Sequence, residues 1–179
     1  MNLKETIASI NQMQADKVIG RYAIGGAVGA SLYLEVGSTE DVDVFAALAA
    51  TPDNLLIDLT SIYKYARARG WKEAGPYIVI GGWKVQFLPP DGLLVEEAIE
   101  KAVEHDLDGM PMRAFTPEYL VAIALKVGRP KDKLRAQLFF ETSNRPEAKF
   151  KLDDAVLSDI LQRHHLIDAW AKFKKQMLG

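Results

Sequence analysis

Residues 23–45 read AIGGAVGASLYLEVGSTEDVDVF, and they carry the clearest fold signal in this chain. A short apolar run ends at Gly25 and Gly26, and further on Asp41 and Asp43 flank a single valine. Side chains on a strand alternate between its faces, so the two carboxylates are predicted to point the same way, about 7 Å apart. Because like charges at that spacing repel each other, a cation between them is expected. Asp41 and Asp43 are therefore predicted to bind a divalent metal ion, Mg²⁺ or Mn²⁺, through their carboxylate oxygens.

The two glycines follow a strand candidate at residues 21–24 and precede a predicted helix over residues 27–34. Backbone N–H groups at the start of a helix bind phosphate, and glycine allows a phosphate to approach closely. A phosphate seat and a metal pair separated by one short helix predict binding of a magnesium nucleotide. Simpler interpretations stay open, namely a solvated strand face and a tight turn. A dinucleotide-binding turn is disfavoured, because G-x-G-x-x-G is replaced by G-G-x-x-G and the acids begin the next strand.

The composition is that of a globular protein that can bury a sizeable core. The chain has 179 residues, of which 49% are hydrophobic and 26% are charged. It has no cysteine, which excludes disulfides and thiolate metal sites and predicts a cytoplasmic location. No apolar run reaches the roughly 20 residues that cross a bilayer, and residues 1–17 do not resemble a secretory signal. A net charge of −2 gives no bulk attraction to nucleic acid, so an anionic partner would require a local basic patch.

The order of predicted elements describes an α+β core over residues 1–115. Apolar residues at helical spacing predict an amphipathic first helix. The clearest hairpin has two β-rich runs joined by Gly81-Gly82, and Gly70 is the predicted stop of the helix before it. The predicted elements are helices over residues 3–13, 27–34, 54–69 and 96–104, and strands over residues 21–24, 42–48, 77–80, 83–88 and 110–115.

Residues 116–179 are predicted to form a helical region packed on that core, and no linker-like composition separates the two parts. Both ends of its first helix are marked by their residue types. Thr116 suits an N-cap, Pro117 suits the first helical position and Gly128 suits the position after the end. Further helices are predicted over residues 131–141 and 153–177, with a break in the second at His164-His165.

The stretch quoted first resembles the signature of the nucleotidyltransferase superfamily, in its small prokaryotic branch. That branch includes the minimal nucleotidyltransferases and the AbiEii-type toxins of toxin–antitoxin and abortive-infection systems. The family pattern is a Gly-Gly or Gly-Ser turn, a short helix, and an acid-x-acid pair on the next strand. The residues that match it are Gly25, Gly26, Asp41 and Asp43.

A second stretch, TPEYLVAIALKVGRPKDK at residues 116–133, is similar to another element of the same branch. In that element a helix ends in a lysine and is followed by an Arg-x-Lys-Asp stretch. The residues that match it are Lys126, Arg129, Lys131 and Asp132. VQFLPP at residues 85–90 and LSDILQRHHLIDAW at residues 157–170 also resemble uncharacterised members. The resemblance thus covers most of the chain, and its specific motifs lie in two places.

The resemblance implies a nucleotidyltransferase-like mixed sheet flanked by helices, with a C-terminal helical extension. Family members transfer a nucleoside monophosphate from an NTP to a hydroxyl acceptor, use two Mg²⁺ ions and release pyrophosphate. The acceptor in such proteins is tRNA, a protein or an antibiotic, and toxin members have an antitoxin partner. The catalytic residues implied are Asp41, Asp43 and Lys126. The nucleotide-binding residues implied are Gly25, Gly26, Lys84, Gln86, Arg129, Lys131 and Asp132.

The position of Gln86 departs from the family pattern. Active members carry a third carboxylate on a neighbouring strand, and this chain has Gln86 there. A glutamine oxygen can ligate a cation, but it brings no charge and accepts no proton. Three interpretations stay open: Glu40 or Asp58 substitutes for the missing acid, one metal ion suffices, or the chain is a nucleotide-binding or partner-binding module without catalysis.

The segment from Lys126 to Arg135 is rich in lysine and arginine, and Asp132 is its only acid. In the functional interpretation Lys126 contacts NTP phosphates and the other basic residues face a polyanionic acceptor such as RNA. The alternative is an interhelical turn with a solvated basic face. Family members often have a second acid at the position of Arg135, which is a further departure.

Overall fold

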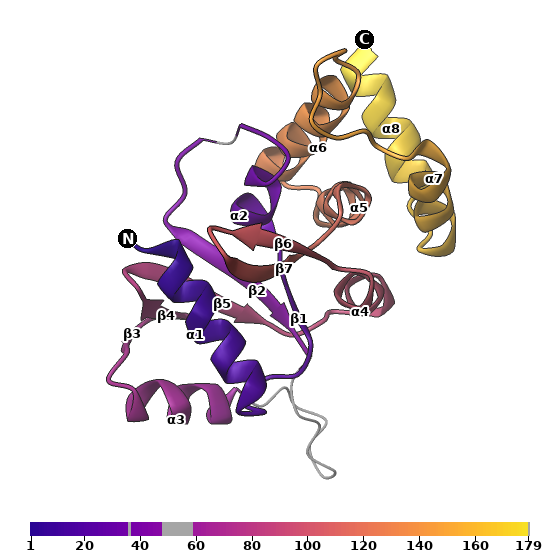
Figure 1. Ribbon diagram of the computed structural model, residues 1–179. Helices are drawn as coiled ribbons and strands as arrows, with labels where there is room; N and C mark the ends of the chain where they lie inside the picture. Colours follow the sequence, from indigo (N-terminus) through magenta and orange to yellow (C-terminus); the bar gives the residue numbers. More distant parts are fainter. Residues whose placement is uncertain (36, 48–58, 179) are drawn as a thin grey trace. The chain divides into compact units, whose positions relative to one another are not determined.

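The computed structural model describes residues 1–35, 37–47 and 59–178 (Figure 1). The chain divides into two compact units. Unit 1 consists of Met1–Val28 and Ser38–Phe115, and unit 2 of Gly29–Gly37 and Thr116–Gly179. Among the described residues, none of the helices combines the length and the apolar character that crossing a bilayer requires.

Within the described residues, unit 1 contains one mixed sheet of seven strands, in the order β3-β4-β5-β2-β1-β7-β6. The pairs β1/β7 and β2/β5 are parallel, and the other neighbouring pairs are antiparallel. The predicted hairpin and the predicted strands at 21–24 and 110–115 are confirmed, and so is the strand predicted over 42–48, which ends at Ala46. Residue 48 of that prediction lies outside the described residues. The strands are β1 (Tyr22–Ile24), β2 (Asp41–Ala46), β3 (Lys72–Ala74), β4 (Tyr77–Ile80), β5 (Trp83–Leu88), β6 (Val103–Leu107) and β7 (Met110–Ala114).

The first helix, α1 (Leu3–Ala15), packs against the sheet as its apolar periodicity predicts. Ile7, Ile10 and Met13 are completely buried. The helix contacts β4 and β7, and the Tyr22 hydroxyl of β1 donates a hydrogen bond to Oδ1 of Asn11, 2.5 Å away. These contacts fix one face of the sheet as the hydrophobic core of unit 1.

Two further helices belong to unit 1. α3 (Thr60–Ala68) ends two residues before Gly70, whose φ of 70° confirms the predicted stop. The start predicted for this helix, residues 54–58, lies outside the described residues. α4 (Leu93–Glu100) contacts β1 and β2 and buries Leu94, Val95, Ala98 and Ile99.

The predicted helix over residues 96–104 is wrong at its C-terminal end, because the chain there enters β6. This strand forms a hairpin with β7 through Asp108-Gly109, whose φ values of 51° and 80° suit a tight two-residue turn. The Asp-Gly pair was a usable signal for this hairpin. Hydrophobic periodicity gave no signal for β6, because this strand reads VEHDL and exposes most of its side chains.

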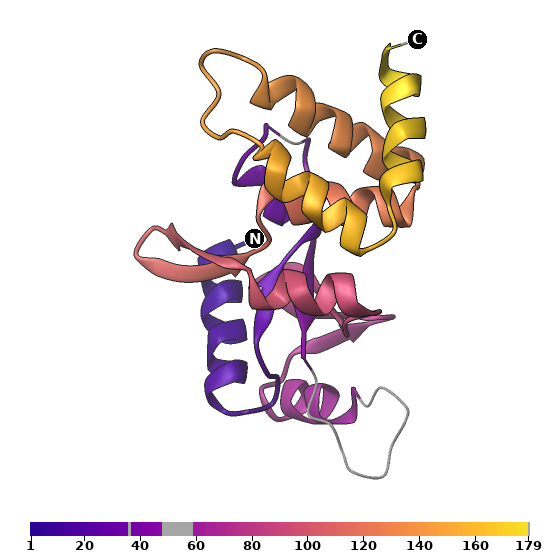
Figure 2. The ribbon, with the colours of Figure 1, turned by 90° about the vertical axis from the view of Figure 1, so that its right-hand side faces the viewer.

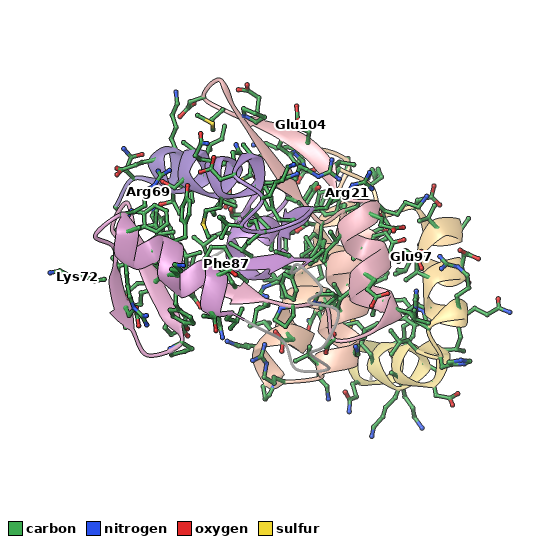
Figure 3. The ribbon with its side chains drawn as sticks, turned by 90° about the horizontal axis from the view of Figure 1, so that it is seen from below. Arg21, Arg69, Lys72, Phe87, Glu97 and Glu104 are labelled. Atoms are coloured by element: carbon green, nitrogen blue, oxygen red, sulfur yellow. The ribbon has the colours of Figure 1, made fainter. Side chains whose placement is uncertain are left out.

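The edge strands β3 and β6 carry charged side chains, and β3 was not predicted from the sequence. Figure 3 shows Lys72 of β3 and Glu104 of β6 extending away from the sheet, while Phe87 lies within the packed interior. Charged residues on short edge strands hinder pairing with the edge of another molecule. Because these strands carry few buried apolar residues, hydrophobic patterning does not predict them.

Unit 2 is helical in its C-terminal part, as predicted, and α5 contacts α6, α7 and α8 (Figure 2). Gly128 follows α5 with a φ of 69°, and His165, with a φ of 57°, lies between α7 and α8 at the predicted break. The predicted helix over residues 27–34 is shorter in the structure, where α2 runs from unit 1 into unit 2. The bounds are α2 (Gly26–Ser31), α5 (Pro117–Val127), α6 (Pro130–Ser143), α7 (Asp154–Arg163) and α8 (Ile167–Leu178).

Alkaline pH should weaken unit 1 through Tyr22. Burial raises the pKa of Tyr22 to about 12, against about 10 for an unfolded tyrosine. The folded state therefore favours the neutral form of Tyr22. The stability that this residue contributes is complete below pH ~10 and is lost as the pH rises toward ~12. We expect the free energy of unfolding to fall over this interval, and to fall less in Tyr22→Phe. Burial also raises the pKa of Tyr33 in unit 2 to about 12, so some decline should persist in the variant. Urea titrations at several pH values measure both.

Candidate functional site

Asp41 and Asp43 lie on one face of β2, as the alternation of the strand predicts. Val42 and Val44, which alternate with them, are completely buried, whereas the two aspartates are partly exposed. Phe45 continues the aspartate face toward the end of the strand. The face of β2 that carries the carboxylates is therefore opposite to the face that carries Val42 and Val44.

The second glycine of the turn lies directly against one of these carboxylates. Gly26 has a φ of 58°, and a Cβ atom placed on it would overlap Oδ2 of Asp43 and lie 2.9 Å from its Cγ. Asp43 therefore faces the glycine turn, and only a residue without a side chain fits there. The turn and Asp43 are therefore in contact, and their sharing of one binding site stays a prediction.

The first glycine is required by packing. A Cβ atom on Gly25 would lie 2.6 Å from the ring of Phe45 and 3.0 Å from that of Phe115. These two rings lie against each other, with centroids 5.0 Å apart. The Gly25 amide also donates a hydrogen bond, 3.0 Å long, to the main-chain oxygen of Asp43. Gly25 thus holds the turn close to β2.

The neighbouring strand β5 adds Lys84 and Gln86 to the same face. β2 and β5 are parallel, with Asp41 paired with Lys84 and Asp43 paired with Gln86. Paired residues on adjacent strands project to the same side of a sheet. Gln86 is therefore beside Asp43, at the position where the resemblance implies a third carboxylate.

Two further residues, Thr39 and Glu40, contact side chains on this face. Neither contact was predicted from the sequence. Glu40 Oε2 is 3.0 Å from Lys84 Nζ, and this hydrogen bond, together with the Glu40 charge, raises the pKa of Lys84. The Thr39 hydroxyl donates to Oδ1 of Asp41 at 2.6 Å and orients that carboxylate. The sequence signal for the contact with Asp41 was a threonine two residues before this aspartate, a spacing at which its hydroxyl can reach the carboxylate. The other suggested substitute acid, Asp58, lies outside the described residues.

The described residues contain no group of three or more histidine, aspartate or glutamate side chains placed to hold a metal ion. Asp41 and Asp43 instead provide two carboxylates, with the neutral amide of Gln86 beside the second. Mg²⁺ is commonly held by one or two protein carboxylates and completed by substrate phosphates and water. The donor set therefore fits a metal ion that is bound together with a nucleotide.

The other four predicted site residues belong to unit 2, where Lys126 is exposed in the last turn of α5. Asp132 lies in the first turn of α6 and is buried. Its carboxylate accepts two hydrogen bonds from Arg129, of 2.6 and 3.3 Å, and Arg135 lies 3.9 Å away. Asp132 thus has a structural role at the start of α6, and Lys131 is exposed beside it. Nucleotide binding by Lys126, Arg129, Lys131 and Asp132 stays a prediction.

Asp132→Asn should destabilise unit 2. The substitution leaves a buried polar group facing two arginines without its charge, and we expect a loss of about 1–3 kcal/mol in the free energy of unfolding. Asp159→Asn is the matched control, because Asp159 pairs with Arg163 at 2.8 Å but is 64% exposed. An exposed pair contributes at most ~1 kcal/mol, so this variant should unfold almost as the wild type does. Chemical unfolding followed by circular dichroism compares the two.

Comparisons with known proteins bear on the fold. No protein-family model and no curated protein matches the sequence. An antigenic nucleotidyltransferase-like protein from Paracoccidioides brasiliensis matches with a TM-score of 0.49 and 17% identity, over 93% of this chain and 91% of that chain. The antibiotic-resistance factor ANT(2'')-Ia in solution matches with a TM-score of 0.52 and 12% identity, over 98% and 96%. ANT(2'')-Ia in complex with adenylyl-2''-tobramycin matches with a TM-score of 0.50 and 15% identity, over 99% of both chains.

The likeness to ANT(2'')-Ia spans nearly all of both chains at low sequence identity, so it concerns the fold. The mixed sheet, its flanking helices and the C-terminal helices agree with the fold class predicted from the sequence. The chain has the nucleotidyltransferase-like α+β fold.

Proposed function

We propose that this protein is a Mg²⁺-dependent nucleotidyltransferase that moves a nucleoside monophosphate from an NTP to a hydroxyl acceptor. The observation that carries the proposal is the contact between Gly26 and the Asp43 carboxylate, with Asp41 on the same face of β2. It places a backbone turn that a phosphate can approach beside two carboxylates that suit a metal ion. The nucleotidyltransferase-like fold supports the same assignment.

Each residue of the site has a specific task in this proposal. Asp41 and Asp43 would hold Mg²⁺, and the Thr39 hydroxyl keeps the Asp41 carboxylate in one orientation. The bound ion would neutralise phosphate charge and lower the pKa of the acceptor hydroxyl. The absence of a side chain at Gly26 lets the Asp43 carboxylate lie against the turn, and the main chain at the start of α2 would bind the triphosphate. Lys126 is the proposed counter-charge for the phosphates.

The reaction itself needs little covalent chemistry from the protein. The acceptor oxygen forms a bond to the α-phosphorus, the bond from that phosphorus to the bridging oxygen breaks, and pyrophosphate leaves. The hydroxyl proton passes to a nearby carboxylate or to water. Positioning and charge neutralisation supply most of the acceleration in such transfers.

RNA and protein are the acceptor classes we propose, and an antitoxin-like partner would accompany a toxin role. Lys131 and Lys133 are exposed at the start of α6, where they could face a polyanionic acceptor. Incubation with α-³²P-labelled NTPs and Mg²⁺ in the presence of total RNA or total protein tests the transfer. Label on either acceptor supports the proposal. Absence of label with all four NTPs and both acceptors contradicts transfer.

Gln86 favours a second candidate function, a nucleotide-binding or partner-binding module that does not catalyse transfer. Its amide lies beside Asp43, where a carboxylate would add negative charge and accept a proton. Under this function the protein binds an NTP in the presence of metal but labels no acceptor.

Gln86→Asp distinguishes a weakened enzyme from such a module. The substitution places a third carboxylate beside Asp43, and we expect Mn²⁺ affinity to rise about 10-fold, because an added charge at a metal site contributes roughly 1.4 kcal/mol or more. Transfer activity should rise with it if the native protein is an enzyme. Gln86→Glu is the control, because it adds the same charge as Gln86→Asp but places the carboxylate one methylene further from the main chain. Calorimetric titration and the labelling assay measure the two effects.

A further inference from the structure

The face of the sheet that carries Asp41 and Asp43 also carries its own cation. Lys84 pairs with Asp41 in the parallel register, and its Nζ lies 3.0 Å from Oε2 of Glu40. The Lys84 main-chain amide also donates to the main-chain oxygen of Glu40, so the two residues are joined twice. Lys84 is therefore the strand neighbour of the first aspartate, and its ammonium group is held by Glu40, the residue before that aspartate.

The charges on this face favour one divalent cation over two. Glu40, Asp41 and Asp43 contribute three carboxylates, Lys84 contributes one ammonium group, and Gln86 contributes no charge. Two metal ions at close range require several carboxylates between them to offset their mutual repulsion. Here the position beside Asp43 is a neutral amide, and the position beside Asp41 is already cationic.

We propose that Lys84 is a built-in cation that takes the place of a second metal ion, so that the site binds a single divalent ion together with its nucleotide. The inference rests on the proposed function, since it concerns the same site. Lys84 acts as a positioning residue: it offsets the charge of Asp41 and Glu40 and repels a further dication. The single ion that binds is then the one that Asp41 and Asp43 would hold in the proposed function.

Three features of Lys84 support this role. Its ammonium group donates a hydrogen bond to Oε2 of Glu40, 3.0 Å away. The strand register fixes its main chain directly opposite Asp41. Its side chain is 49% exposed, so substitution leaves the core intact and the variants should fold.

The number of bound ions tests the inference directly. Free Mn²⁺ is measured by electron paramagnetic resonance during titration of the protein with a nonhydrolysable ATP analogue at saturation. We expect one Mn²⁺ per ternary complex for the wild type. In Lys84→Met we expect a second Mn²⁺ to bind, and in Lys84→Glu we expect two ions with at least 10-fold tighter binding of the second. Lys72→Met, an exposed lysine on edge strand β3, should behave as the wild type.

The outcomes separate this inference from the proposed function. Two Mn²⁺ ions in the wild type, or one ion with unchanged affinity in both Lys84 variants, would overturn the inference and leave the proposed function standing. No Mn²⁺-dependent nucleotide binding in the wild type would overturn both. Circular dichroism and thermal unfolding of each variant confirm that a change in stoichiometry comes from the site.

Discussion

Asp43→Asn is expected to abolish the stabilisation of this protein by Mg²⁺ and NTP. A ligand at 100 times its dissociation constant stabilises a fold by about 2.7 kcal/mol, so the wild type should unfold several degrees higher with Mg-NTP. The asparagine keeps the shape of the side chain but removes the charge that a metal ion requires. We expect the affinity for Mg-NTP to fall at least ~100-fold, because one close charge on a dication is worth several kcal/mol at the dielectric of a protein surface. Transfer activity should fall by ~10³-fold, because positioning of the α-phosphate depends on the ion.

Without metal, the same substitution should leave the fold intact or make it slightly more stable. Asp41 and Asp43 lie on one face of β2, and removing one of two like charges relieves their repulsion. Glu104→Gln is the matched control, because Glu104 is an exposed acid of the same sheet on edge strand β6. Thermal unfolding with and without Mg-NTP compares the three proteins. If Asp43→Asn kept the wild-type shift, Asp43 would not be a metal ligand and the assignment of the site would be wrong.

Gly26→Ala should impair the site almost as severely while keeping every charged residue. The new methyl group would occupy the position of Oδ2 of Asp43 and approach its Cγ to 2.9 Å, so the carboxylate has to move. The left-handed φ of 58° adds strain, because a Cβ atom in that region costs roughly 1–2 kcal/mol. Overpacking adds about 1–3 kcal/mol, so we expect a total destabilisation of about 2–5 kcal/mol and loss of metal-dependent NTP binding.

Gly70→Ala separates the two causes. Gly70 has a φ of 70°, but a Cβ atom there would meet no other atom within 4 Å. This control should lose only ~1–2 kcal/mol from backbone strain and should bind Mg-NTP as the wild type does. Chemical unfolding and calorimetric titration of both variants give stability and affinity separately. Wild-type affinity in Gly26→Ala would show that the contact between Gly26 and Asp43 has no part in nucleotide binding.

The sequence predicted the elements whose residue types act locally. The helix at Leu3–Ala15 has its apolar residues at helical spacing, and the hairpin at Gly81-Gly82 has β-rich runs on both sides of its turn. Thr116, Pro117 and Gly128 marked both ends of α5. Each of these signals depends on neighbouring residues alone, so it can be read before the chain is folded.

Other elements could not be predicted in this way. The edge strands β3 and β6 are short and charged, and they are strands because a neighbouring strand supplies hydrogen bonds to them. The end of the helix predicted over residues 96–104 was misplaced for the same reason. Pairing between strands is a property of the folded chain and leaves little trace in a local pattern.

By itself the sequence determined that Asp41 and Asp43 lie on the same face of a strand, because alternation is built into an extended chain. Only the tertiary structure decided what surrounds them. The parallel register of β2 and β5 set Lys84 beside Asp41 and Gln86 beside Asp43, and the turn at Gly26 was brought against the Asp43 carboxylate. These neighbours are distant along the chain, and they meet because burial of the apolar faces of the sheet fixes the register of its strands.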